Sequence, residues 1–324
     1  MEQTAIGKIM KGVGGLYTVR LLSECHLPIG EQVLCRARGS FRHEGLTPLP
    51  GDTVTVLFSD SADTAKDKKG AKGEQAGAVI DSIHERSCAL IRPPLANLNV
   101  LFVTMAAASP TPILTTTDKL ISIAEFNGIE PVIIVTKQEL DPLYASELCT
   151  LYESCGFTCF ATSSTDGTGI EALRKYIDQS LTGRIAAFAG ASGIGKSTLM
   201  NRLFPTLQLS TSEISRKIER GRHTTRHVEL FCLSDESDCG YIADTPGFSM
   251  LDFERFDFFD KEDLPTTFRE FVPHIGNCRY TKCSHTKEDG CAILEAVRKG
   301  EIPHSRHESF RQLYDTLKVK KKWN

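Results

Sequence analysis

Long hydrophobic runs, a basic amino-terminal leader and a large net charge are all missing from the sequence. The longest apolar stretch, residues 98–108, is interrupted by Asn99 and Thr104 and falls well short of the roughly 20 residues of a membrane-spanning helix. The first three residues supply no basic start for a signal peptide. A formal net charge of -3 excludes a polycation, so nucleic-acid binding would depend on local basic patches. We expect a cytoplasmic protein with no membrane partner.

A disorder-promoting composition and an even, disulfide-like set of cysteines are missing as well. Hydrophobic residues make up 40% of the chain and charged residues 24%, which is the balance of a folded globular protein. With 324 residues the chain is about twice as long as a typical domain of roughly 150, which predicts two or three folded units. Eleven cysteines, an odd number without a secretion signal, indicate reduced thiols. Most of them stand in apolar runs, where we expect small buried side chains.

Short alternating segments with glycine between them fill the chain up to about residue 92. In one of them Val54, Val56 and Phe58 fall on one face of a strand, as a period of two requires. The five segments cover residues 5–11, 17–22, 31–37, 53–58 and 78–84. Five short strands predict a small closed β-barrel of the OB-fold type, and a barrel of another kind is the alternative. The polar stretch 59–77 is predicted to be a mobile loop.

From about residue 93 apolar strand-like runs alternate with helical patterns. Near-continuous Val and Ile runs suit strands that are buried on both faces, so we expect an α/β domain with a mostly parallel sheet. One helix is marked by Asp141 as its cap, Pro142 at its first position and Gly156 at its end. After about residue 257 no sheet-like run appears, and helices are expected near 291–300 and 305–317.

The segment from Gly190 to Thr198 carries the clearest functional signal. It reads GASGIGKST and matches G-x-x-x-x-G-K-[ST], with an apolar run before it and a helical pattern after it. In such a P-loop the backbone N–H groups surround phosphate oxygens, Lys196 reaches the terminal phosphates and Ser197 offers a hydroxyl to Mg²⁺. The alternative is a plain glycine turn, which the strand, loop and helix context disfavours.

A second phosphate-associated motif, DTPG, places Asp244 at the end of an apolar run and Gly247 three residues later. Behind a P-loop this pattern is typical of a switch in which the carboxylate holds Mg²⁺ and the glycine amide senses the γ-phosphate. Thr224 or Thr225, between the two motifs, would supply another hydroxyl to Mg²⁺. Taken alone, DTPG is also an ordinary turn sequence.

DTPG at this distance from a P-loop is typical of GTPases, which also need a loop that reads guanine. No such loop follows DTPG. Upstream, however, one apolar run ends in Thr136, Lys137, Gln138 and Glu139, and the next ends in Ser163 and Ser164. We predict that these segments bind the base, whereas the alternative for the first is a simple exit from a strand. The base-reading half then precedes the phosphate half.

Three cysteines and one histidine crowd together near the carboxyl terminus. Cys278, Cys283, His285 and Cys291 provide three thiolates and one imidazole, a set that suits one closed, tetrahedral Zn²⁺ site. Metal-binding energy would help a segment with a small core to fold, so the zinc is expected to be structural. Four unrelated residues in a reducing compartment are the alternative.

With this motif order the chain resembles the RsgA family of circularly permuted GTPases, also called YjeQ or YloQ. The resemblance covers nearly the whole length and rests on the barrel, the permuted motifs, the sequence GRHTT in the switch region and the Cys-x4-Cys-x-His-x5-Cys pattern. It implies binding of GTP or GDP with Mg²⁺, and GTP hydrolysis stimulated by the 30S ribosomal subunit. It also implies contact with 16S rRNA and a role late in small-subunit maturation.

Two departures from common GTPase patterns bear on activity. Glu139 stands where the family usually has Asp, and Thr136 where Asn is common, so we predict a retained but weakened preference for guanine. Phe248 occupies the place where many GTPases have the glutamine that orients water, which predicts slow intrinsic turnover. His223 is the candidate to orient water, alongside Lys196 as the other catalytic residue; a purely structural histidine is the alternative.

The candidate nucleotide-binding residues are Thr136, Lys137, Gln138, Glu139, Ser163, Ser164, Gly190, Ala191, Ser192, Gly193, Ile194, Gly195, Lys196, Ser197, Thr198, Thr225, Asp244 and Gly247. Ser197, Thr225 and Asp244 are the candidate Mg²⁺ ligands. The predicted domains are an OB-fold RNA-binding domain at 1–92, a permuted GTPase domain at 93–256 and a helical zinc domain at 257–324. We expect a monomer.

Basic side chains offer weaker signals for RNA. The last segment, from residue 296, has a surplus of Lys and Arg that could bind rRNA or simply be a solvated face, and Arg36, Arg38, Phe41 and Arg42 form a similar candidate in the barrel. Two other functions compete. A small-molecule kinase would need an arginine-rich lid, which is missing between DTPG and the cysteines. An RNA-binding protein with a vestigial nucleotide site would need a damaged P-loop, yet Lys196 and Ser197 are intact.

Overall fold

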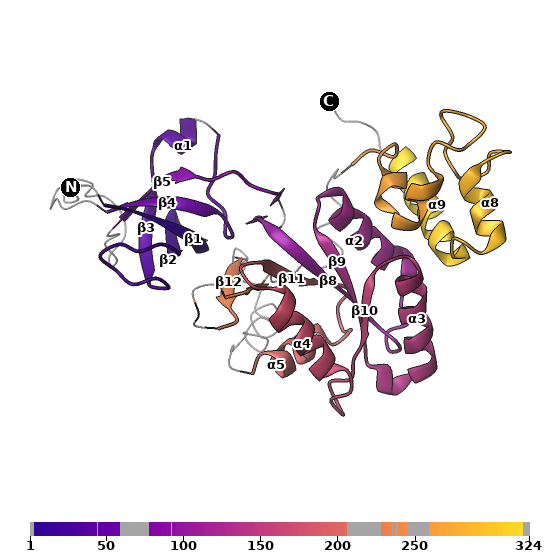
Figure 1. The fold of residues 1–324 in the computed structure, drawn as a ribbon, viewed down its shortest axis with the longest axis horizontal. Coiled ribbons are helices and arrows are strands. Elements are labelled where there is room, and N and C mark those ends of the chain that lie inside the picture. Colours follow the sequence, from indigo (N-terminus) through magenta and orange to yellow (C-terminus); the bar gives the residue numbers. More distant parts are fainter. Residues whose placement is uncertain are drawn as a thin grey trace, which may run out of the picture. The chain divides into compact units, whose positions relative to one another are not determined.

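The structure is a computed structural model that describes residues 3–43, 45–58, 78–91, 93–205, 228–234, 236, 239–244 and 259–319 (Figure 1). The chain divides into two compact units. The first comprises Met1–Leu98, Ser180–Ala187 and Ser212–Gly247, and the second comprises Asn99–Gln179, Phe188–Thr211 and Phe248–Asn324.

A closed five-stranded barrel forms the amino-terminal part of the first unit, drawn in indigo and purple in Figure 1. Its strands are β1 (Gln3–Val13), β2 (Leu16–Leu21), β3 (Gln32–Ala37), β4 (Thr53–Phe58) and β5 (Ala78–Ile83), with the short helix α1 (Ser40–His43) after β3. The barrel closes because β1 pairs with both β2 and β4, while β5 pairs with β3 and β4. Val54 and Val56 are buried inside it with Ile9, Val19 and Ile80, which confirms the predicted alternation. The stretch 59–77, predicted to be a mobile loop, lies outside the described residues.

Two further strand pairs belong to the first unit. The sequence did not predict β6 (Ala89–Leu90) and β7 (Leu95–Ala96), which pair antiparallel over only two residues each. β12 (Glu229–Cys232) pairs antiparallel with β13 (Tyr241–Asp244), and β13 runs parallel to the first residues of β11 (Ile185–Ala189).

The second unit contains the parallel strands of the predicted α/β fold. β9 (Glu130–Thr136) lies between β8 (Leu98–Ala106) and β10 (Thr158–Ala161) and runs parallel to both. The helices of this part are α2 (Leu114–Phe126), α3 (Pro142–Ser154), α4 (Ile170–Ser180) and α5 (Lys196–Leu203), with the 3-10 turn η2 (Gln138–Leu140) after β9. The Asp141 side chain accepts a hydrogen bond of 3.0 Å from the Tyr144 N–H, which confirms the predicted helix cap.

The carboxyl-terminal part of the second unit, residues 259–319, contains only helices and turns. They are η3 (Leu264–Thr267), η4 (Arg269–His274), α8 (Ala292–Lys299) and α9 (His304–Val319), and the last two confirm the predicted helices. A small core of Phe268, Phe271, Ile293 and Phe310 holds them together. Among all described residues, no helix combines the length and apolarity needed to cross a bilayer.

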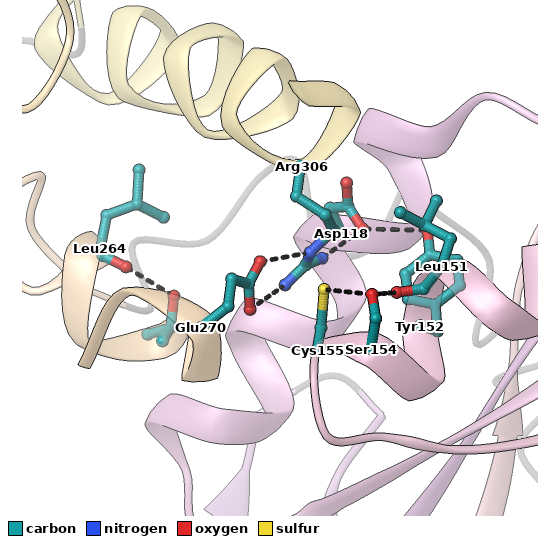
Figure 2. Close-up of polar contacts among 9 residues, drawn as sticks. Asp118, Leu151, Tyr152, Ser154, Cys155, Leu264, Glu270 and Arg306 are labelled. Atoms are coloured by element: carbon teal, nitrogen blue, oxygen red, sulfur yellow. Dashed lines mark hydrogen bonds and ion pairs between the residues drawn. The ribbon is translucent and has the colours of Figure 1, made fainter. Parts of the chain in front are cut away.

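A buried ion network fastens α9 to α2, as Figure 2 shows. Arg306 of α9 donates to Asp118 of α2 and, over 2.7 Å, to Glu270 of η4. Its guanidinium is almost completely buried and lies 4.5 Å from the centre of the Phe268 ring. The Tyr152 hydroxyl of α3 donates to the same Asp118 carboxylate at 3.0 Å. Although burial disfavours the charge, the two carboxylates raise the pKa of Arg306 above its ordinary value, so the arginine stays ionised.

Candidate nucleotide site and metal centre

The P-loop leaves β11 after Ala189 and ends in the first turn of α5. Gly190 has a φ of +147°, and a Cβ there would overlap the Thr104 carbonyl oxygen of β8. Gly195 caps α5 in a left-handed conformation with a φ of 93°. The buried Thr104 hydroxyl donates to the Ala189 carbonyl at 2.6 Å. Glycine at these two positions and the threonine on β8 therefore set the path of the loop.

Lys196 turns back over this loop. Its Nζ donates to the carbonyls of Gly190 at 2.8 Å and Ala191 at 2.6 Å. Burial lowers the pKa of Lys196 from 10.5 to about 8. Phosphate oxygens would stabilise the ammonium more strongly than carbonyls do, because a phosphate group is an anion and a carbonyl is neutral. Ser197, the next residue, is exposed, so its hydroxyl is open to a ligand.

The predicted base-reading loop is bonded directly to the P-loop within the second unit. Thr136, at the end of β9, is buried, and its Oγ1 lies 2.5 Å from the Ile194 carbonyl oxygen and 3.1 Å from that of Met105. Lys137, with a φ of 55°, donates from Nζ to the Gly193 carbonyl at 2.9 Å and also to that of Ser109. The structure thus brings together two segments that lie more than fifty residues apart in the sequence.

The loop after β10 is also hydrogen-bonded to the base-reading loop. The Gln138 backbone N–H donates to the Thr162 carbonyl at 3.2 Å. Ser163 is fully buried, and its Oγ accepts a hydrogen bond of 3.2 Å from the Asp166 N–H. The Thr165 hydroxyl donates to Glu139 Oε1 at 3.1 Å. Sequence reasoning missed Thr165 as well as Thr104 and Ser109, because no motif or spacing marks them.

Asp244 is the last residue of β13, in the first unit. It stands opposite Glu229 in the register of β12 and β13. Burial, together with the negative charge of Glu229, raises the pKa of Asp244. A divalent cation would remove this penalty, so the site chemistry is compatible with the predicted Mg²⁺ role. His223, Thr224, Thr225 and Gly247 lie outside the described residues, and their roles stay predictions.

The predicted zinc ligands converge in the carboxyl-terminal part. The ligand atoms of Cys278, Cys283, His285 and Cys291 all lie within 4.8 Å of one another. Cys278 Sγ is 3.8 Å from Cys291 Sγ, and His285 Nδ1 is 3.5 Å from each of these sulfurs. A tetrahedral Zn²⁺ with Zn–S of about 2.3 Å and Zn–N of about 2.05 Å would separate two sulfurs by about 3.8 Å and a sulfur from a nitrogen by about 3.5 Å. All four residues therefore fit this metal in donor type, and Cys278, His285 and Cys291 fit it in spacing as well.

The surroundings of the cluster also suit a metal. Burial lowers the pKa of His285, which keeps its imidazole neutral and able to act as a ligand. Nε2 of His307, on α9, lies 2.8 Å from the His285 carbonyl oxygen. The Ala292 N–H donates to Cys278 Sγ at 3.3 Å. The loop that carries the ligands is thus joined to α8 and α9.

Comparisons with known proteins place this architecture in one family. A family model described as RsgA GTPase matches residues 83–254, and one described as RsgA N-terminal domain matches residues 6–65. The chain belongs to the RsgA GTPase family. It is therefore a GTPase with a circularly permuted GTPase domain and a Cys3His group that could hold a metal.

Relatives and solved structures match over almost the full length. A protein of Alkaliphilus metalliredigens named small ribosomal subunit biogenesis GTPase RsgA is 37% identical over 98% of this chain and 99% of its own. One of the same name from Ruminiclostridium cellulolyticum is 39% identical over 97% of this chain and 94% of its own. The crystal structure of YjeQ from Thermotoga maritima matches with a TM-score of 0.77 and 29% identity over 98% of this chain and 100% of that one. The crystal structure of YloQ, a circularly permuted GTPase, matches with a TM-score of 0.74 and 29% identity over 99% of this chain and 97% of that one.

Proposed function

We propose that this RsgA-family GTPase binds the 30S subunit through 16S rRNA and hydrolyses GTP faster when bound, late in small-subunit maturation. The observation that carries the nucleotide part is the bonding of Thr136 and Lys137 to the backbone of the P-loop. A loop that reads the base and a loop that holds phosphate must act on one molecule, and these bonds fix one against the other. The ribosomal part is supported by the names of the relatives.

The proposed nucleotide-binding residues are the full set that the sequence predicts. Lys196 and the P-loop backbone would bind the phosphates, and Ser197, Thr225 and Asp244 would hold the Mg²⁺ that neutralises phosphate charge. Thr136 to Glu139 would bind guanine, with Ser163 and Ser164 behind the base. His223 would orient the attacking water when the ribosome is bound.

The other parts of the chain have proposed roles in assembly. We assign the barrel at 1–92 and the zinc domain at 257–324 to rRNA contact and the domain at 93–256 to the GTPase reaction. One structural Zn²⁺ would be bound by the Cys3His cluster, whose four ligand atoms lie within 4.8 Å of one another. A factor that matures ribosomal subunits in this way would act in the cytoplasm as a monomer.

Phosphate release from GTP and ATP, with and without 30S subunits, tests the proposal. We expect turnover of GTP alone, strong stimulation by 30S subunits and loss of activity in Lys196→Ala. Glu139→Ala should bring the affinities for GTP and ATP closer together. Equal turnover of both nucleotides, or turnover indifferent to 30S subunits, would point to another NTPase. Normal stimulated turnover in His223→Ala would remove the role of that histidine.

A further inference from the structure

The carboxylate of Glu139 is held by one oxygen only. Oε1 accepts the hydrogen bond of 3.1 Å from the Thr165 hydroxyl. Oε2 is buried and has no hydrogen-bond partner among the described residues. A buried carboxylate oxygen without a donor is unfavourable, and a ligand that brings a donor to Oε2 would relieve this cost.

Thr165 is itself held by a tightly bonded turn. The Gly167 N–H donates to the Ser163 carbonyl at 3.0 Å, and the Ser163 N–H donates to the Thr168 carbonyl at 2.9 Å. Thr168 N–H in turn donates to Asp166 Oδ1 at 2.8 Å. These bonds involve residues before and after Thr165 in the sequence, so they fix the backbone from which its hydroxyl reaches Glu139.

The length of the Glu139 side chain makes this contact important. Glutamate has one more methylene and one more rotatable bond than aspartate, so its carboxylate would sample several positions if it were free. Guanine presents two adjacent donors, the N1–H and the 2-amino group, and both need a carboxylate in one orientation. Adenine presents an acceptor at N1, which a carboxylate repels. Selectivity thus depends on how firmly the carboxylate is oriented.

We propose that Thr165 is a positioning residue for base selection: its hydroxyl fixes the Glu139 carboxylate so that the second oxygen is presented to the donor edge of guanine. This inference rests on the proposed role of Glu139. On this proposal the hydroxyl compensates for the extra methylene, so a preference for guanine is expected to be retained.

Competition of GDP, IDP and ADP against a fluorescent GDP derivative tests this role in the full-length protein. Thr165→Val removes the hydroxyl at nearly constant volume, and we expect GDP affinity to fall about tenfold while ADP affinity is unchanged. The ratio of GDP to IDP affinity should also fall, because IDP lacks the 2-amino group. Thr165→Ser, which retains a hydroxyl, should restore both the GDP affinity and the ratio of GDP to IDP affinity. Thr150→Val is the matched control, since among the described residues the Thr150 hydroxyl bonds within α3, to the Ser146 carbonyl at 2.9 Å.

A double-mutant cycle adds a readout that a purely structural threonine would not affect. Asp at position 139 is too short to use the Thr165 hydroxyl in the same way, so Thr165→Val should change GDP affinity less than about twofold in a Glu139→Asp background. An undiminished effect in that background would overturn the proposal. So would an equal loss of affinity for GDP, IDP and ADP, which would mean that the loop rather than the carboxylate was disturbed.

The Glu139→Ala variant separates failure of this inference from failure of the proposed guanine site. If Glu139→Ala abolishes the GDP preference and Thr165→Val does not change it, guanine reading by Glu139 stands and the Thr165 role is wrong. If Glu139→Ala leaves the preference intact, the guanine site itself is wrong, and the Thr165 role falls with it.

Discussion

The nucleotide loops and the carboxyl-terminal helices both gather polar groups in the second unit, but they treat them differently. At the nucleotide loops Glu139 Oε2 lacks a partner among the described residues and Ser197 is exposed. Around Arg306, by contrast, a buried cation is bonded to two carboxylates from two other elements, and Asp118 Oδ2 is the oxygen there that has no hydrogen-bond partner among the described residues. Polar groups without a protein partner are available to bind a ligand, whereas polar groups that are bonded to each other hold secondary-structure elements together. The same chemistry therefore serves binding in one region and architecture in the other.

Removal of a zinc ligand is the strongest test of the architectural side. In Cys291→Ser we expect loss of the bound zinc and of hydrogen-exchange protection in α8 and α9, because structural zinc contributes about 10–16 kcal/mol of binding free energy in small zinc domains. Metal analysis and hydrogen exchange by mass spectrometry measure both effects. Cys25→Ser changes a cysteine that is not one of the four ligands and should retain zinc. A full complement of zinc with normal protection in Cys291→Ser would mean that the cluster does not organise these helices.

Breaking the ion network should have the next largest effect. Arg306→Met leaves Asp118 and Glu270 buried without their cation, so the free energy of unfolding should fall by about 3–5 kcal/mol. Urea denaturation measures the change. The control is Arg298→Met, because Arg298 is 67% exposed in its side chain and its pair with Glu295 should contribute less than about 1 kcal/mol. Similar small losses in both variants would show that the buried network does not fasten α9 to α2.

Local patterns in the sequence were sufficient to predict most of the fold. The P-loop context, the Asp141 cap and the alternation of Val54 and Val56 each depend on neighbouring residues, and the structure confirms all three. The two-residue strands β6 and β7 were missed because so short a pairing leaves no period to detect.

The contacts that complete the sites could not be predicted in this way. Arg306 and Asp118 are 188 positions apart, and the bond from Thr104 to Ala189 spans 85. Thr165 is closer to Glu139, at 26 positions, but a threonine in a turn has an ordinary local explanation. Such pairs arise only when the tertiary fold brings distant elements together, so composition and spacing give no sign of them.

On the binding side, the lysine of the P-loop predicts a pH dependence of nucleotide affinity. Burial lowers the pKa of Lys196 to about 8, and phosphate binds the protonated form, so the bound state has the higher pKa. Affinity for GDP should therefore be constant well below pH 8 and fall by up to about tenfold per unit above it. Isothermal titration calorimetry from pH 6.5 to 9.5 measures this. Lys196→Arg, which stays charged, should remove the decline; a flat profile in the unmodified protein would contradict the assignment.

The smallest expected effect comes from loss of the side-chain cap at the start of α3, where a backbone N–H is already paired. Asp141 caps α3 directly after η2, and Asp141→Ala leaves the Tyr144 N–H without its acceptor, at a cost of about 1 kcal/mol in unfolding free energy. Urea denaturation measures the loss. Asp178→Ala, in α4, is the control, because the exposed Asp178 only approaches Arg174 at 3.5 Å and should contribute less than about 0.5 kcal/mol.

The ratio of GDP to ADP affinity distinguishes Asp141→Ala, which removes a helix cap, from Thr165→Val, which changes the base-reading region. Asp141 starts α3, and among the described residues no hydrogen bond or ion pair joins its side chain to Glu139, so its loss should lower stability while leaving base preference unchanged. Thr165→Val should instead lower the base preference while leaving stability unchanged. If Asp141→Ala shifted the ratio as strongly as Thr165→Val, the base-reading loop would depend on the start of α3 as a whole, and the separation between groups that hold the fold and groups that await a ligand would not apply there.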